Sequence, residues 1–151
     1  MMPPFHFAYH VDDLMAARAF YGGLLGCAEG RSTETWVDFD FFGHQISLHF
    51  GVPFAIANTG KVGNHLVPMP HFGVVLPYVT WRALADRLEE AKTFFLLAPS
   101  VRFEGEAGEQ WTIFFTTFWI ICSIGMCIGR KRNGFSISFS NHLYLGNTFG
   151  F

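Results

Sequence analysis

The alternation of hydrophobic and polar residues divides the chain into two halves with the same order of predicted elements. Each half opens with a short apolar run, Phe5–Val11 and later Phe72–Leu76, which is typical of a buried strand. The tripeptide His6-Phe7-Ala8 of the first run recurs as His71-Phe72-Gly73, at an offset of 65 residues. The pattern therefore predicts an internal repeat.

An amphipathic helix is predicted after each of these strands. In the first half, Asp12 or Asp13 can cap the segment MAARAFYGGLLG, and Gly22, Gly23 and Gly26 are expected to end that helix. In the second half, Thr80 can cap the segment WRALADRLEEAK, whose apolar residues fall on one face. Each half is thus expected to place one helix against its strands.

Strands with alternating hydrophobicity follow each helix, as in VDFDFF and HQISLHF. Glu34-Thr35-Trp36 matches Glu109-Gln110-Trp111 at an offset of 75, and Gly43–Leu48 matches Gly134–Phe139 at an offset of 91. The predicted fold class is α+β, with paired βαβββ modules forming a curved mixed sheet around a cavity. The modules are expected at residues 4–75 and 76–140, followed by a tail at 141–151.

The same offsets predict an insertion in the second half. Trp36 and Gly43 are seven residues apart, whereas Trp111 and Gly134 are 23 apart, so sixteen extra residues fall within about 116–133. Hairpin connections usually have a few residues. A shifted reading frame, a retained intervening sequence or a recent insertion would each produce such a stretch. We expect an apolar insertion whose residues 118–121 form an exposed or intermolecular patch; the alternative is an integral strand.

Charge is distributed unevenly along the 151 residues. Residues 1–109 hold all 12 acidic residues and 7 of the 10 basic ones, whereas residues 110–129 carry no charge at all. Twenty such residues could span a bilayer, but the threonines and glycines among them favour strands over a membrane span. The overall charge of −2 favours neither nucleic acid nor a membrane as partner. Three cysteines without paired spacing favour a reducing compartment, the cytoplasm.

Five segments together resemble one known family: PFHFAYHVDDLMAARAFYGGLLGCAEGRS, WVDFDFFGHQISLHF, VPMPHFGVVL, WRALADRLEEA and VRFEGEAGEQWTIFF. They resemble the vicinal-oxygen-chelate superfamily of glyoxalase, bleomycin-resistance and extradiol dioxygenase proteins. The resemblance implies a metal-dependent lyase or dioxygenase that acts on a small substrate with vicinal oxygens, and a homodimer. The alternatives are a small-molecule binding or sequestering protein of the bleomycin-resistance kind, or an inactive variant.

The resemblance implies that His6 and His71 are ligands of a divalent metal, Fe, Mn, Ni or Zn. Two imidazoles and a carboxylate with open coordination positions suit such ions, although a single histidine in an apolar strand is also commonly structural. The family's third ligand is a glutamate within a segment like D-P-x-G-N-x-x-E-F, which this sequence lacks. The repeat places Ser138 there, so metal binding is expected to be weak or absent.

Two further residues are candidates for the site. His49 is in phase with Ser47 on its strand and can face the same cavity as a metal ligand, although a rim or core histidine is the alternative. Glu109 ends an acidic stretch and is a candidate catalytic acid or base at the cavity mouth, where a solvated loop is the alternative. Cys27 has no basic neighbour in the sequence and is interpreted as a small hydrophobic residue.

Overall fold

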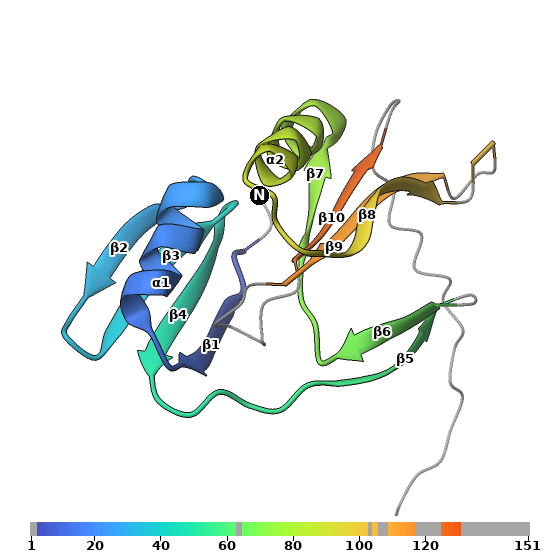
Figure 1. Ribbon diagram of the computed structural model, residues 1–151. Helices are drawn as coiled ribbons and strands as arrows, with labels where there is room; N and C mark the ends of the chain where they lie inside the picture. The colour runs from blue at the N-terminus through green and yellow to red at the C-terminus, as the bar shows by residue number, and fades with distance from the viewer. Residues whose placement is uncertain (1–2, 63–64, 103, 106–108, 117–124, 131–151) are drawn as a thin grey trace, which may run out of the picture.

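A computed structural model describes residues 3–62, 65–102, 104–105, 109–116 and 125–130 of the chain (Figure 1). The described elements, in chain order, are β1 (His6–Val11), α1 (Leu14–Arg18), the π-helical segment η1 (Ala19–Leu24), β2 (Ala28–Ser32), β3 (Trp36–Phe41), β4 (His44–Phe50), β5 (Ala57–Val62), β6 (His65–Met69), β7 (Val74–Pro77), α2 (Tyr78–Glu90), β8 (Phe95–Arg102), β9 (Gln110–Phe115) and β10 (Gly125–Arg130).

Two four-stranded sheets with the same strand order form the framework, β1-β4-β3-β2 and β7-β10-β9-β8. In each sheet the first strand pairs in parallel with the last strand of its module, and the remaining pairs are antiparallel. Each module thus has the order strand, helix and three strands. The predicted α+β fold of paired βαβββ modules is confirmed.

A two-stranded hairpin of β5 and β6 lies between the two modules in the chain. It forms a sheet of its own, set apart from the first sheet by the long segment that follows β4 (Figure 1). The sequence pattern had not predicted this hairpin. Its strands, ANTGKV and HLVPM, are short and alternate poorly, so they carry little signal above that of a loop.

The first helix starts as the sequence predicts, but the helical segment η1 continues through Gly22 and Gly23, so only Gly26 of the three predicted glycines follows its end. The side chain of Asp13, rather than that of Asp12, caps it by accepting a hydrogen bond from the Ala16 amide at 2.9 Å. Gly26 follows the last turn with φ of +73°, a backbone conformation that residues with a Cβ atom rarely adopt. A Cβ there would also lie 3.0 Å from the guanidinium of Arg87.

The start predicted for the second helix is wrong by three residues. Helix α2 begins at Tyr78, directly after Pro77, and no side chain caps it. Thr80 is therefore an exposed residue of the first turn and not the cap. Pro77 has an extended backbone that ends β7 and leads straight into the helix. Proline is tolerated at a helix start because the backbone N–H that it lacks would have no partner within the helix there.

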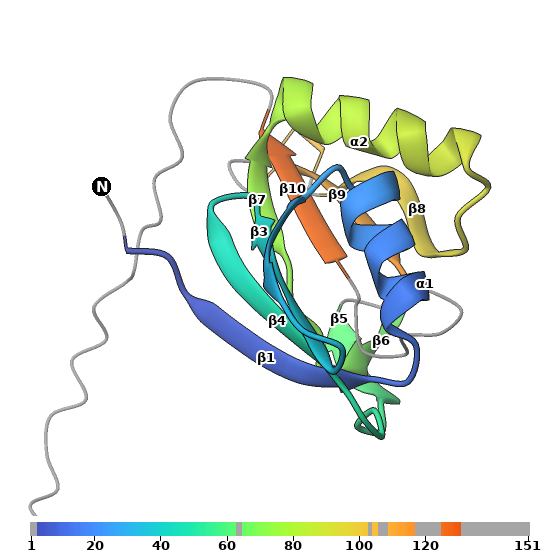
Figure 2. The same ribbon diagram turned by 90° about the vertical axis from the view of Figure 1, so that its left-hand side faces the viewer.

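One continuous core joins the two modules. Buried apolar residues of both sheets and both helices form a single cluster, with Tyr21 and Trp81 fully buried. Phe20 of η1 packs against Phe115 of β9 with ring centroids 6.0 Å apart. Arg87 of α2 donates a hydrogen bond to the carbonyl oxygen of Leu25 at 3.1 Å. The helical sides of the modules therefore pack together, and Figure 2 shows α1 on one side of the sheet that contains β1 and β4.

The final strand of the second module lies earlier in the chain than the repeat offset predicts. Strand β10 lies between β7 and β9, the place that β4 occupies in the first sheet. The alignment of Gly43–Leu48 with Gly134–Phe139 is therefore wrong, and with it the assignment of Ser138 to the position of the glutamate. A short match of a glycine followed by alternating residues can recur by chance in a chain so rich in phenylalanine. The place of a strand is determined instead by its pairing with the other strands of the sheet.

The predicted insertion at 116–133 is consequently not a loop throughout. Residues 125–130 are strand β10, and the connection from β9 to β10 comprises residues 116–124, against residues 42–43 between β3 and β4. The uncharged segment 110–129 thus contributes two strands. Among the described residues no helix is long and apolar enough to cross a membrane. The predicted apolar patch at 118–121, Gly134–Phe139 and Ser138 lie outside the described residues.

The two tryptophans matched by the repeat lie on different faces of their sheets. Trp36 stacks on His49, with ring centroids 6.1 Å apart, on the face without a helix. Trp111 packs against Trp81 of α2 at 5.4 Å, on the face with a helix. Successive residues of a strand point to opposite faces of its sheet. The offset of 75 therefore matches residues on opposite faces and is wrong by one residue.

Candidate functional site

The first sheet has a polar face on the side opposite its helix. Strand register places three cross-strand rows on this face: His6, Gln45 and Asp40; Ala8, Ser47 and Asp38; His10, His49 and Trp36. The intervening residues of the same strands, such as Tyr9, Phe39 and Leu48, are buried in the core. The period of two in these strands thus separates a hydrophobic face from a face that carries the candidate histidines.

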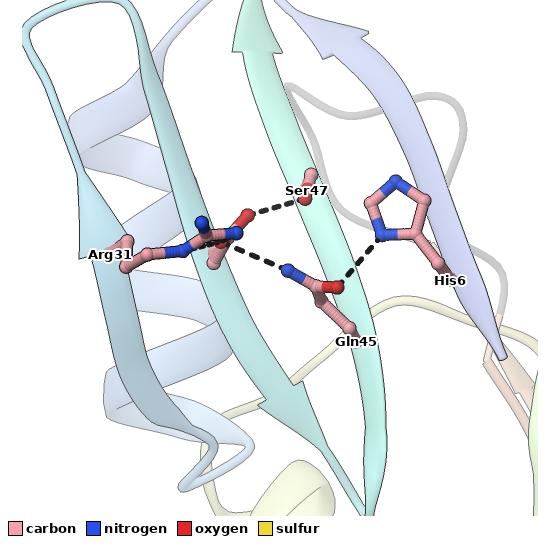
Figure 3. A network of polar contacts seen from close by, with 5 residues as sticks. His6, Arg31, Gln45 and Ser47 are labelled. Carbon is pink, nitrogen blue, oxygen red and sulfur yellow. Dashed lines mark hydrogen bonds and ion pairs between the residues drawn. The ribbon is translucent and has the colours of Figure 1, made fainter. Parts of the chain in front are cut away.

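A buried carboxylate, that of Asp38, lies at the centre of the polar face. Asp38 is 5% exposed. Its Oδ2 accepts hydrogen bonds from Arg31 Nε at 3.2 Å and Nη2 at 3.1 Å, and from Gln45 Nε2 at 3.0 Å. Its Oδ1 accepts from the Ser47 hydroxyl. Figure 3 shows these side chains converging from three neighbouring strands.

The hydrogen bonds determine the charge state of Asp38. Burial alone would raise the pKa of its carboxyl group. The hydrogen bonds from Ser47, Arg31 and Gln45, together with the positive charge of Arg31, outweigh burial and hold that pKa below its usual value of 3.8. Asp38 is therefore ionised at neutral pH, and each of its neighbours in the network donates to it.

The network extends to His6 through Gln45. The Oε1 atom of Gln45 lies 3.0 Å from Nδ1 of His6. His6 is exposed, and its Nε2 atom has no partner among the described residues. Figure 3 shows the imidazole at the end of the polar contacts, on β1.

The second predicted ligand, His71, lies in the segment before β7 and is half-buried. Its Nδ1 atom is 2.8 Å from the carbonyl oxygen of Pro68, and its ring contacts Phe114 of β9 at 5.3 Å between centroids. The chain neighbours of the two histidines touch, because the rings of Phe7 and Phe72 lie 5.0 Å apart. That both imidazoles bind one ion stays a prediction.

A pocket of about 620 Å³ opens beside the outer strand β1. It is lined by Phe7, Ala8, Tyr9, His10, His49, Val52, Phe54 and Pro70. Most of this lining is aromatic or aliphatic, and its polar side chains are two histidines and a tyrosine. The size and lining suit a small, partly apolar molecule.

Of the predicted site residues, His49 lines this pocket, while His6, His71 and Glu109 are not among the lining residues. Glu109 is half-buried and accepts a hydrogen bond from the Gly105 amide at 2.9 Å, so it holds the turn before β9. Its role as an acid or base stays a prediction. Cys27 is buried, and burial with the nearby charge of Asp40 raises the pKa of its thiol to about 12, so it is not a nucleophile.

The metal expected from the family is only partly accommodated by the described residues. The histidines offer suitable nitrogen donors, since a carbonyl oxygen beside Nδ1 of His71 requires the proton there and leaves the lone pair on Nε2. In the described parts of the chain, however, no three histidine, cysteine, aspartate or glutamate residues are grouped so that they could hold a metal ion.

Several residues of the site were missed by sequence reasoning. Asp38, Gln45 and Ser47 carry no signal in the sequence beyond their places in alternating strands. His10 is exposed, and it also lines the pocket and packs against Gly51. Within that alternation one signal was available. Asp38 lies between Val37 and Phe39, and the second acid of this strand, Asp40, is in phase with it. Two acids in phase between apolar residues indicate a polar face on which one of the carboxylates is buried.

No family model and no curated protein sequence matches the chain. Solved structures do. A glyoxalase/bleomycin resistance protein/dioxygenase from Alicyclobacillus acidocaldarius is 25% identical, with 83% of this chain and 90% of that chain covered and a TM-score of 0.64. Fosfomycin resistance protein FosX from Listeria monocytogenes, in complex with Mn(II) and sulfate, is 17% identical over 82% and 86% of the chains, with a TM-score of 0.57.

A lactoylglutathione lyase from Agrobacterium tumefaciens is also similar, at 15% identity, 85% and 96% coverage and a TM-score of 0.57. The last two similarities show the fold alone. The first, at 25% identity, confirms the resemblance to the vicinal-oxygen-chelate superfamily that the sequence indicated.

Proposed function

We propose that this chain is a glyoxalase/dioxygenase-like protein that takes a small molecule with vicinal oxygens, with a divalent metal held by His6 and His71. One observation carries the proposal. Each of these histidines engages an oxygen atom through Nδ1 and leaves Nε2 without a partner among the described residues. Histidine ligands of metals are typically oriented in this way, by a hydrogen bond from the ring nitrogen that does not bind the metal.

A bound Fe, Mn, Ni or Zn ion would polarise the oxygen atoms of a chelating substrate. The chain's own residues supply the remainder. The apolar wall of Phe7, Val52 and Phe54 would exclude water from the bound molecule, and His49 would be a third nitrogen ligand or a hydrogen-bond partner. Glu109 is proposed as an acid or base near the site. Because the described ligands are neutral imidazoles, the metal is expected to bind weakly.

A second candidate function is the binding or sequestering of a small molecule without chemistry. It is favoured by the absence, within the described ranges, of a group of three metal-ligating side chains, and by the largely apolar pocket. An inactive variant of the enzyme would have the same pocket and no turnover. For each of these functions the bound partner is a small molecule. A homodimer is proposed because the resemblance to the superfamily implies one.

Metal titration of the purified full chain separates these functions. Isothermal titration with Mn²⁺ and with Zn²⁺ should show about one weak site per chain, which both His6→Ala and His71→Ala remove. His44→Ala is a matched control, since His44 lies on the same sheet and its Nδ1 accepts a hydrogen bond from the Phe5 amide at 3.2 Å.

Metal binding that survives both substitutions, or that is lost equally in His44→Ala, would contradict the assigned ligands. A wild-type chain that binds neither metal but binds a small molecule in the pocket would establish the sequestering function instead. Fluorescence of Trp36 reports such binding, because its ring stacks on His49, which lines the pocket.

A further inference from the structure

We propose that Asp38 and Gln45 are positioning residues that fix the tautomer of His6, with the proton on Nδ1 and the lone pair on Nε2. The inference begins at the buried carboxylate. An ionised carboxylate can only accept hydrogen bonds, and Asp38 is held in that state by Arg31 and Ser47. Its neighbour Gln45 must therefore direct its NH₂ group toward Asp38, as the 3.0 Å contact from Nε2 to Oδ2 shows.

The orientation of the Gln45 amide then determines the state of the imidazole. With Nε2 turned to Asp38, the atom of Gln45 that faces His6 is Oε1, which can only accept. A hydrogen bond at 3.0 Å thus requires the proton of neutral His6 to be on Nδ1. The carboxylate of Asp38 on β3 thus fixes the orientation of the Gln45 amide on β4, and this amide fixes the position of the proton on the His6 imidazole on β1 (Figure 3).

The consequence is a lone pair on Nε2 of His6 that has no partner among the described residues. Free neutral imidazole carries its proton mainly on the nitrogen distal to the side chain, so an isolated His6 would have a protonated Nε2. The network reverses this preference and leaves on Nε2 a lone pair that can bind a metal ion or accept a hydrogen bond from a bound molecule. Its use as a metal ligand rests on the proposed function; the tautomer itself rests only on the hydrogen bonds.

The tautomer is measurable in the metal-free full chain. Long-range ¹H–¹⁵N spectra of histidine-labelled protein, in chelator at about pH 8 where imidazoles are neutral, distinguish protonated from unprotonated ring nitrogens. For wild-type His6 we expect a protonated Nδ1 and an unprotonated Nε2. Gln45→Ala, which removes the acceptor, should return the proton largely to Nε2.

A second variant tests the origin of the constraint. Asp38→Asn keeps the shape of the side chain but can donate as well as accept, so Gln45 is free to turn over and His6 should show both tautomers. The matched control is Asp40→Asn on the same strand and face. Asp40 is the cross-strand neighbour of Gln45, but its Oδ1 accepts from the Gly43 amide, and it has no hydrogen bond to Gln45 among the described residues. It should leave the His6 spectrum unchanged.

The outcomes are separable from those of the proposed function. A protonated Nε2 in wild-type His6, or a spectrum that Gln45→Ala leaves unchanged, overturns the inference, as does a change of equal size in Asp40→Asn. If the tautomer behaves as expected and Mn²⁺ and Zn²⁺ still do not bind, the positioning network stands and the proposed metal function fails. If metal binds, Gln45→Ala should weaken it by about 10- to 100-fold.

Discussion

The two sheets have the same strand order and differ in the chemistry of their faces. In the first sheet, the face without a helix holds an ionised, buried carboxylate whose neighbours all donate to it. In the second, strand β9 presents Thr112 and Phe114 between the core residues Trp111, Ile113 and Phe115, and the hydroxyl of Thr112 is buried without a partner among the described residues.

The difference shows how a repeated fold can divide structural and chemical roles. Backbone pairing and the helix-covered faces are alike, and they form one continuous core. The first sheet adds a polar network that orients a histidine, whereas the second contributes apolar surface and a histidine, His71, held by a backbone carbonyl. The polar network of one sheet and the apolar packing of the other can each be tested by substitution.

The largest effect is expected in the apolar core of the second module. Trp81→Ala should lower the free energy of unfolding by about 4 kcal/mol, because this fully buried ring packs against Tyr78 and Trp111 and its removal leaves a cavity. Urea unfolding followed by circular dichroism measures the loss. Val79→Ala, on the exposed side of the same helix, is the control and should change stability little. A loss below about 1 kcal/mol in Trp81→Ala would show that the second module contributes little to the core.

A smaller effect is expected when the polar network of the first sheet is broken. Asp38→Ala leaves Ser47 and Gln45 without their acceptor, while the exposed Arg31 can return to water, so we expect a loss of about 2 kcal/mol in the free energy of unfolding. The exposed Glu34→Ala provides the control and should remain close to wild type. Equal stability of Asp38→Ala and wild type would mean that the network orients residues without stabilising the fold.

The stability that Asp38 supplies should depend on pH. Its folded-state pKa lies below the unfolded value of 3.8, so the carboxylate stabilises the folded chain above that pH and the contribution disappears as the pH falls through the folded pKa. Urea midpoints measured from pH 7 down to about pH 2.5 should therefore fall more steeply for wild type than for Asp38→Asn. Parallel curves for the two proteins would show that the folded chain does not lower this pKa.

Sequence reasoning predicted the fold well because its signals were local. The apolar runs, the Asp13 cap and the alternation of VDFDFF lie within single elements, and the structure confirms the element types. The errors arose where an offset was carried over a distance. Matching Trp36 with Trp111 reversed the face, because a shift of one residue in a strand exchanges its two faces. Matching Gly43 with Gly134 placed the last strand too late in the chain, since strand β10 is Gly125–Arg130.

The candidate site was predictable only in part. His6 and His49 could be placed on one face from their phase, but the partners of His6 depend on cross-strand register, which pairs it with Gln45 at a distance of 39 residues in the chain. Asp38 could have been noticed as an acid between two apolar residues. Its hydrogen bonds with Arg31, Gln45 and Ser47 require the three-dimensional arrangement of three strands.

The smallest effects provide the sharpest comparison, because two hydroxyl groups at buried positions should respond with opposite signs. Thr112→Val replaces a buried hydroxyl that has no partner among the described residues, so it should stabilise the chain by about 1 kcal/mol. Ser47→Ala removes a hydroxyl that donates to Asp38, so it should destabilise the chain by about 1 kcal/mol. The two substitutions can be measured side by side in urea.

Their sum tests the distinction between the sheets directly. The affected positions lie in different sheets and share no partner, so the double variant Ser47→Ala with Thr112→Val should unfold close to the wild-type midpoint. Two losses of similar size would show that Thr112 is hydrogen-bonded in solution, and the second sheet would then have a polar contact of its own. Two gains would show that the Ser47 contact to Asp38 is dispensable, because Arg31 and Gln45 already satisfy the carboxylate.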